Sequence, residues 1–232
     1  MGTGLLTLVP TRNRVENALE FLDIFYSNVT VESSSGLLFV VGTEDPRLEE
    51  YRNKIPKNHL LIFPDRGLVK ALNYAAPLYV EEYEAIGFMG DDHRPRTPGW
   101  DSAYLNELRR LGHGYVYGND LLMGERIPTQ VAISSSIIKA LGFFGPKEFV
   151  HLCVDLTWKD MGEALGRISY LDDVIVEHMH PAAGKAKEDS GYQHANSKLM
   201  VKMDTQTYFR WKARDMGHQV QKVAQELGIV LP

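Results

Sequence analysis

The first half of the chain alternates short apolar runs with amphipathic stretches, and this alternation constrains the fold more than any other feature of the sequence. The apolar runs have the length of strands, and apolar residues recur at helical spacing in the segments between them. Strands that alternate with helices are typical of βαβ units and a largely parallel sheet. The sequence predicts strands at 5–9, 37–41, 60–63 and 85–89, and helices at 15–26, 68–76 and 100–111. Pro77 is expected to end or kink the second of these helices.

The second half of the chain is less regular. It predicts strands at 131–134, 168–170 and 174–176, and a helix at 155–165 that Gly166 ends. From about 192 to 227 the sequence is polar and helix-prone, which indicates one or two C-terminal helices. These helices are expected to pack on the domain or to join two copies of the chain in a homodimer.

The composition excludes several classes of protein. A formal net charge of -5 disfavours a general nucleic-acid-binding surface, which needs clustered Lys and Arg. Cys153 is the only cysteine, so no internal disulfide or cysteine-based zinc cluster is expected, and a reducing compartment is favoured. No apolar run approaches the ~20 residues of a membrane span, and the N-terminus lacks the pattern of a secretion signal. We therefore expect a cytoplasmic protein with no membrane partner.

The apolar run at 85–90 ends abruptly in Asp91, Asp92 and His93. Carboxylates and imidazoles are rarely buried without partners, so the strand is expected to deliver these side chains to a site at its end. Hard oxygen ligands with one imidazole suit Mg²⁺ or Mn²⁺, and such a cation can hold a phosphate. The alternative is that the two carboxylates only cap the turn that continues through 95–100.

Polar and mostly charged residues also follow the other three predicted strands. They are Pro10, Thr11, Arg12, Asn13 and Arg14 after the first, Glu44 and Asp45 after the second, and Asp65, Arg66 and Gly67 after the third. Thr11 or Asn13 is a candidate helix cap, whereas the arginines are better explained as phosphate contacts. Open α/β sheets bind ligands at this edge, so four such endings favour a pocket.

The order of these motifs, continued by Leu68-Val69-Lys70-Ala71-Leu72-Asn73 after Gly67, resembles the nucleotide-sugar-binding half of GT-A-fold glycosyltransferases. It is most similar to the broad family 2 group, and the resemblance covers about residues 4–180. It implies an α/β fold with an open mixed, mainly parallel sheet flanked by helices and followed by C-terminal helices. The implied division is a catalytic domain at 1–185, with a donor-binding half at about 1–100 and an acceptor half at about 101–185, and a helical extension at 186–232.

The resemblance also implies roles for individual residues. In the family, an acidic motif after the fourth strand holds the cation and the donor ribose, so Asp91 would face the ribose and Asp92 the metal. Because Gly90 and His93 flank the pair, a second alignment matches Asp91-Asp92-His93 to the Asp-x-His variant of polypeptide N-acetylgalactosaminyltransferases, in which His93 shares the metal. The implied donor-nucleotide-binding residues are Pro10, Thr11, Arg12, Arg14, Glu44, Asp45, Arg66, Gly67, Lys70 and Asp91.

The second half supplies further candidates. Similar enzymes carry an acidic acceptor-side base near the position of Asp155, so the resemblance implies that Asp155 is the base of an inverting transfer. The alternative is that Asp155 is only the N-cap of a helix. His178 and His180 alternate on a predicted strand and would share a face, which favours a metal or phosphate contact. Family members often supply a late histidine to the metal or the diphosphate, so the resemblance implies this role for His178. His180 and Trp100 are candidate acceptor or sugar contacts, and the alternative for Trp100 is a core or interface position, where large aromatics more often lie. Lys185 and Lys187 lie in a loop that either closes over the diphosphate or remains a solvated lid without contact.

The sequence therefore predicts a glycosyltransferase that requires Mn²⁺ or Mg²⁺ and moves a sugar from a nucleotide-diphosphate sugar, most simply a UDP-sugar, to an acceptor hydroxyl. The acceptor stays open between a glycan, a protein, a small molecule and a modified nucleobase. Two alternatives remain. A sugar-phosphate nucleotidyltransferase uses a similar sheet, although its usual glycine-rich loop is missing at 10–14. The other alternative is a non-catalytic module that binds nucleotide sugars.

Overall fold

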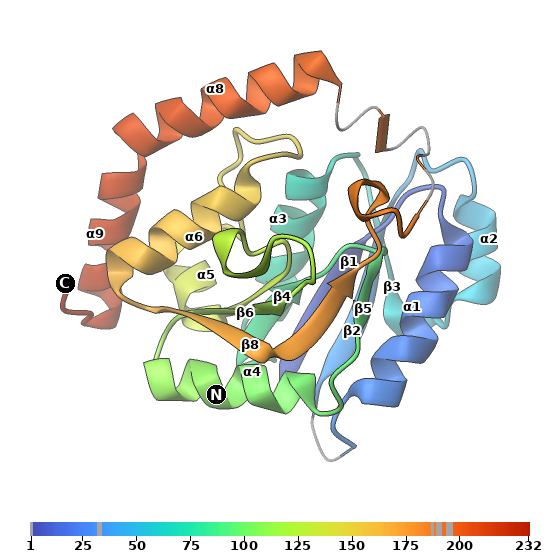
Figure 1. Cartoon of the computed structure of the whole chain (residues 1–232), viewed down its shortest axis with the longest axis horizontal. Coiled ribbons are helices and arrows are strands. Elements are labelled where there is room, and N and C mark those ends of the chain that lie inside the picture. The colour runs from blue at the N-terminus through green and yellow to red at the C-terminus, as the bar shows by residue number, and fades with distance from the viewer. Residues whose placement is uncertain (1, 32–33, 187, 189–191, 194–196) are drawn as a thin grey trace.

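The computed structural model describes residues 2–31, 34–186, 188, 192–193 and 197–232. Within these residues the chain forms one mixed sheet of eight strands in the order β3-β2-β1-β4-β7-β6-β8-β5, with helices on both faces (Figure 1). The strands are β1 (Leu5–Pro10), β2 (Gly36–Gly42), β3 (Leu60–Phe63), β4 (Ala85–Phe88), β5 (His93–Pro95), β6 (Tyr115–Asn119), β7 (Val131–Ser134) and β8 (Ile168–His178). The helices are α1 (Val15–Asn28), α2 (Leu48–Lys54), α3 (Leu68–Tyr79), α4 (Trp100–Leu111), α5 (Ser135–Leu141), α6 (Val154–Leu165), α8 (Lys198–Arg214) and α9 (Met216–Leu227), with 3₁₀ turns η1 (Lys57–His59), η2 (Gly124–Arg126) and η3 (Pro181–Ala183).

The first four strands form the parallel part of the sheet. β1 lies between β2 and β4 and is parallel to both, with Thr7 paired to Leu37 on one side and to Gly87 on the other. The chain adds β2 and β3 on one side of β1 and then β4 on the other side. In open α/β sheets, ligands bind outside the carboxyl ends of the strands where the order reverses in this way.

The remaining strands carry the chain back to the end of β4. β7 is antiparallel to β4, β6 is antiparallel to β7, and β8 runs parallel to β6. The short strand β5 follows β4 after a turn and pairs antiparallel with the last residues of β8. The ends of β4 and β8, which are distant in the sequence, therefore lie together (Figure 1).

Apolar side chains fill a layer on each face of the sheet. Along β1, Leu6 and Leu8 point into the layer that α3, α5, α6 and α9 cover, whereas Leu5 and Val9 point into the layer under α1, α2 and α4. All four side chains are buried. Burial on both faces explains why these strands read as nearly continuous apolar runs rather than as an alternating pattern.

The C-terminal helices belong to the first of these layers. Trp211 of α8 and Val223 of α9 are buried in the same apolar cluster as Trp158 of α6. The division of the chain at residue 185 and the homodimer through these helices stay predictions. Among the described residues, no helix combines the length and the apolar character needed to cross a bilayer.

The structure confirms the strands and helices predicted for the first half, and it differs in three respects. α3 continues through Pro77 to Tyr79, because a proline in the last turn interrupts few helical hydrogen bonds. The two strands predicted at 168–176 are one strand, β8, and its pairing with β6 shifts beside Gly118 and Asn119. The short elements α2, β5, β6 and α5 were not predicted, since a few residues show little periodicity.

Replacing Trp211 tests whether α8 unfolds together with the sheet. Trp211 is 2% exposed and contacts Phe149 with 6.4 Å between ring centroids. We expect Trp211→Ala to lower the free energy of unfolding by about 3–5 kcal/mol in a single transition, because it leaves a large cavity in a shared core. The control is Phe209→Ala on the same helix, where the side chain is 64% exposed. This variant should change the free energy of unfolding by about 0.5 kcal/mol or less. Urea denaturation followed by circular dichroism measures both; a separate early transition for the helices would contradict the shared core.

Candidate functional site

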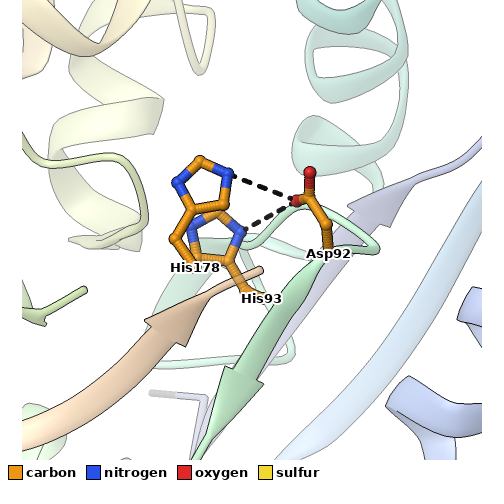
Figure 2. Close-up of side chains that lie close together, drawn as sticks. All are labelled: Asp92, His93 and His178. Carbon is orange, nitrogen blue, oxygen red and sulfur yellow. Dashed lines mark ion pairs between the residues drawn. The ribbon is translucent and has the colours of Figure 1, made fainter. Parts of the chain in front are cut away.

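Three side chains with metal-ligand chemistry meet where β5 pairs with β8. His93 lies directly opposite His178 in this pairing, and their imidazoles stack with ring centroids 4.2 Å apart. Oδ1 of Asp92 lies 3.5 Å from Nδ1 of His93 and 3.6 Å from Nε2 of His178. Figure 2 shows both rings facing the same carboxylate oxygen. Strand pairing thus joins two parts of the chain that the sequence keeps far apart.

The donor atoms of this group fit a divalent cation. One ligand atom from each of Asp92, His93 and His178 lies within 4.8 Å of the others. A carboxylate with two imidazoles is a donor set that divalent first-row metals accept, and it leaves coordination positions for oxygen ligands such as phosphate. In the described part of the chain this is the only such group of three side chains.

The protonation of the group also suits a cation. Burial would raise the pKa of Asp92, but its contacts with His178 and His93 hold that pKa well below the usual value. Burial and the neighbouring His178 lower the pKa of His93, so this imidazole is neutral near pH 7. An anionic carboxylate beside a neutral imidazole is the form in which these groups bind metals.

The turn that carries the group is held by Gly90 and Arg94. The backbone N–H of Gly90 donates to Nδ1 of His93 at 3.0 Å, and a Cβ on Gly90 would lie only 2.5 Å from Oδ1 of Asp92. Arg94 is buried and donates to the carbonyl oxygens of Asp91 and His93 at 2.8 and 2.7 Å. Glycine at position 90 is therefore required by the close approach of Asp92, and Arg94 fixes the backbone on which the ligands stand.

Asp91 points away from this group, toward β1 and α1. Its Oδ2 accepts a hydrogen bond from the Thr11 hydroxyl at 2.5 Å, and its Oδ1 pairs with the Arg14 guanidinium at 3.0 Å. The Thr11 hydroxyl gives its only proton to Asp91, so in its contact with the buried Tyr51 hydroxyl it must be the acceptor. The Tyr51 oxygen in turn accepts the backbone N–H of Arg14 at 2.9 Å. Burial and the charge of Asp92 raise the pKa of Asp91 above its usual value, while Arg14 and Thr11 partly lower it.

Asp45 fastens the loop after β1 to the loop after β2. Its Oδ2 accepts the backbone N–H of Asn13 at 2.9 Å and its Oδ1 accepts that of Arg47 at 2.8 Å. Neither Thr11 nor Asn13 caps α1, whose N-cap position is Arg14, so the capping interpretation of these residues was wrong. Asp45 is mostly buried and holds the loop in place beside Asp91.

The other predicted donor-binding residues lie at the same edge of the sheet with more exposure. Pro10 and Arg14 are partly buried, whereas Arg12, Glu44, Arg66, Gly67 and Lys70 are exposed. Lys70 forms an ion pair with Asp65 at 2.7 Å, and Gly67 precedes α3 with a φ of 109°, which favours glycine. The basic side chains therefore border the site from the loops after β1 and β3.

Asp155 lies in the first turn of α6. Its Oδ1 accepts the backbone N–H of Leu156 at 2.9 Å, and the N-cap position is Cys153, so Asp155 is not the N-cap. Burial raises the pKa of Asp155 to about 6, and the nearby His178 moderates that rise.

The two predicted acceptor or sugar contacts have different outcomes. Trp100 is fully buried and packs edge-on against Phe25 and Tyr104, with ring centroids 5.5 and 5.4 Å away, so the prediction that it contacts a sugar was wrong. β8 ends at His178, so His180 does not continue a strand as predicted. Its ring nevertheless contacts His178, with centroids 4.8 Å apart, and it stays a candidate contact.

The predicted lysine loop is only partly described. Lys185 forms an ion pair with Glu177 at 2.8 Å, and Lys187 lies outside the described residues.

Sequence reasoning missed the buried Asp120, which directly follows β6 and lies 4.0 Å from Nδ1 of His178 through its Oδ2. The other site residues were predicted because each is a charged side chain that follows a strand. The same pattern would have indicated Asp120 if β6 had been predicted.

Backbone conformation marks the same loops. The non-glycine residues with positive φ in the described chain are Asn13, Leu121 and Cys153, each within two residues of a site residue. Such strained positions cluster at functional sites.

No protein-family model matches the chain, and a search of curated proteins finds no relative by sequence. Solved structures do match the fold. A mannosyltransferase from Pyrobaculum calidifontis in complex with GDP-Man and Mn²⁺ has a TM-score of 0.59 at 13% identity, over 98% of this chain and 75% of that one. Glucosyl-3-phosphoglycerate synthase from Mycobacterium tuberculosis in complex with Mg²⁺ and UDP has a TM-score of 0.60 at 14% identity, over 99% of this chain and 81% of that one. TarS 1–349 from S. aureus in complex with UDP has a TM-score of 0.56 at 17% identity, over 97% of this chain and 70% of that one.

These neighbours are GT-A-type proteins, and the chain has the same fold: a mixed, mostly parallel sheet flanked by helices. At these identities the likeness establishes the fold alone.

Gly90→Ala tests the close packing of the metal-ligand group. The new Cβ would meet Oδ1 of Asp92, so the carboxylate must turn away from the imidazoles. We expect Mn²⁺ affinity, measured by electron paramagnetic resonance, to fall by about 10-fold or more, as when metal ligands lose their support. Gly217→Ala is the matched control, because a Cβ there meets nothing within 4 Å. Equal affinity of the two variants would show that Asp92 does not bind the ion in this geometry.

Proposed function

We propose that this protein is a metal-dependent glycosyltransferase that moves a sugar from a nucleotide-diphosphate sugar to an acceptor hydroxyl. The observation that carries the proposal is the convergence of Asp92, His93 and His178, with Asp91 beside them, at the carboxyl end of the strands where the sheet order reverses. The GT-A fold supports it, since solved structures with this fold include a mannosyltransferase with GDP-Man and Mn²⁺. A UDP-sugar is the proposed donor, because two of the matched structures hold UDP.

The donor nucleotide would lie over the loops that follow β1, β2 and β3. Asp91, whose carboxylate is held by Thr11 and Arg14, would accept hydrogen bonds from the ribose hydroxyls. Asp45 or the exposed Glu44 would contact the base. The exposed Arg12, Arg66 and Lys70, together with Arg14, would border the phosphates, and Pro10 and Gly67 would shape the loops that carry them.

The cation, Mn²⁺ or Mg²⁺, would be held by Asp92 with His178 and His93. When bound, it supplies positive charge that stabilises the diphosphate as the leaving group develops negative charge. Asp155 would act on the acceptor side as the general base. It would take the proton of the acceptor hydroxyl as that oxygen attacks the anomeric carbon, which inverts the configuration. His180, which contacts His178, would lie near the sugar or the acceptor.

Donor turnover with Asp92→Asn tests the proposal. The purified protein is incubated with UDP-sugars and Mn²⁺, and release of UDP is measured with and without a chelator. We expect metal-dependent release by the native protein and a loss of about 100-fold or more in the variant, because an amide replaces the anionic ligand. Glu107→Asn, at a carboxylate on α4 that pairs with Arg110 of the same helix and contacts Ser169, is the control and should keep full activity. Binding of UDP-sugars without any turnover would instead show a non-catalytic module.

The pH profile tests Asp155 as the base. Its pKa is raised to about 6, so the carboxyl is protonated below that pH and cannot accept a proton. We expect kcat at saturating donor to rise about 10-fold per pH unit below 6 and to level off above it. Asp155→Asn should remove most of kcat while it leaves the dissociation constant of the donor within about twofold, because the side chain acts in the chemical step. Unchanged kcat in this variant would exclude the role.

A further inference from the structure

Asp120 lies at the centre of a hydrogen-bond network behind the two imidazoles. It is 1% exposed. Its Oδ1 accepts the backbone N–H groups of Leu122, Met123 and Gly124 at 2.9, 2.7 and 2.8 Å, and its Oδ2 accepts the hydroxyl of Thr129 at 2.7 Å. These bonds hold the following residue, Leu121, in a left-handed conformation with a φ of 57° that a leucine rarely adopts. The orientation of the carboxylate is therefore fixed by its own loop.

One branch of the network reaches His93. The single hydroxyl proton of Thr129 goes to Asp120, so the Thr129 oxygen, 3.4 Å from Nε2 of His93, can only accept there. Nε2 of His93 consequently carries the proton. Nδ1 accepts the N–H of Gly90 and is unprotonated, and it lies on the side of Asp92.

The second branch reaches His178. Its Nδ1 is buried and has no hydrogen-bond partner among the described residues, and Oδ2 of Asp120 lies 4.0 Å away. A buried polar atom without a partner is destabilising, so a small closure that lets Nδ1–H donate to Asp120 is favoured. The proton then stays on Nδ1, and Nε2, which is 3.6 Å from Oδ1 of Asp92, keeps its lone pair.

We propose that Asp120 is a positioning residue that fixes the ring proton of His178 on Nδ1, the nitrogen directed away from Asp92, while Gly90 and Thr129 fix that of His93 on Nε2. His178 then presents the lone pair of Nε2 to the point that Asp92 faces, whereas the lone pair of His93 Nδ1 accepts the N–H of Gly90. A carboxylate that accepts the second N–H of a metal-binding histidine fixes its tautomer and orientation, and its loss usually weakens metal binding. The consequence for metal binding rests on the proposed function, but the proton positions are properties of the metal-free chain.

Asp120→Asn gives opposite expectations for the two rings. The amide oxygen must remain with the three backbone N–H groups, so the amide nitrogen takes the place of Oδ2 and becomes a donor toward His178. We expect the His178 proton to move from Nδ1 to Nε2. His93 should keep its tautomer, because Gly90 still donates to its Nδ1. ¹⁵N-histidine spectra of the metal-free protein, assigned with His93→Gln and His178→Gln, measure both rings.

Metal affinity provides the second readout. Mn²⁺ binding to Asp120→Asn should weaken about 10- to 100-fold, as for other residues that orient metal ligands. Asp173→Asn, which removes the same charge from an exposed position on β8, should leave both the tautomers and the affinity unchanged. Thr129→Val interrupts only the branch to His93 and should weaken binding less than Asp120→Asn does.

Each outcome decides the proposal. A native His178 protonated on Nε2 overturns it, even if Asp120→Asn fails to fold, and so does an Asp120→Asn variant with the native tautomers. The expected tautomers in a protein that binds no Mn²⁺ would support the positioning role of Asp120 and refute the proposed metal-dependent function instead.

Discussion

The antiparallel pairing between β5 and the end of β8 is the interaction on which the whole candidate site depends. It sets His93 opposite His178 and brings both to Asp92. A strand of three residues has little stability alone, so its neighbours must hold it. Arg94, buried in β5, donates to the backbone of the preceding turn and pairs with Glu20 of α1 at 2.7 Å. The site is thereby anchored to the parallel half of the sheet as well as to β8.

Sequence patterns predicted the parts of the site that local order determines. Buried strands are recognised by their apolar runs, and the residue that follows each run can be placed at one edge of a parallel sheet without further information. Thr11 after β1 indeed meets Asp91 after β4, with β1 and β4 as direct neighbours. His178 was also predicted, because the resemblance to GT-A-fold glycosyltransferases implies a late histidine at the cation and because, with His180, it follows a predicted strand.

The parts that long-range packing determines could not be predicted. Tyr51 belongs to a helix too short to show a period, yet its hydroxyl links Thr11 to the backbone of α1. Asp120 follows a strand whose pattern is broken by Gly118 and Asn119. Trp100 failed for the opposite reason: its proximity to the acidic motif in sequence indicated a sugar contact, whereas the inward face of α4, which it shares with Tyr104, places it in the core. Adjacency in sequence does not determine which face of an element a residue occupies.

The adjacent carboxylates of Asp91 and Asp92 show how one turn separates two functions. Asp91 faces the Thr11 hydroxyl and the Arg14 guanidinium, while Asp92 faces the imidazoles. Burial raises the pKa of Asp91, and the charge of Asp92 raises it further, because the two carboxylates repel each other. A cation at Asp92 would offset this repulsion and favour the ionised form of Asp91, in which both carboxylate oxygens can accept hydrogen bonds from ribose hydroxyls. Because such coupling is reciprocal, a nucleotide at Asp91 would in turn strengthen the cation site, so the geometry of this turn favours binding of the two together.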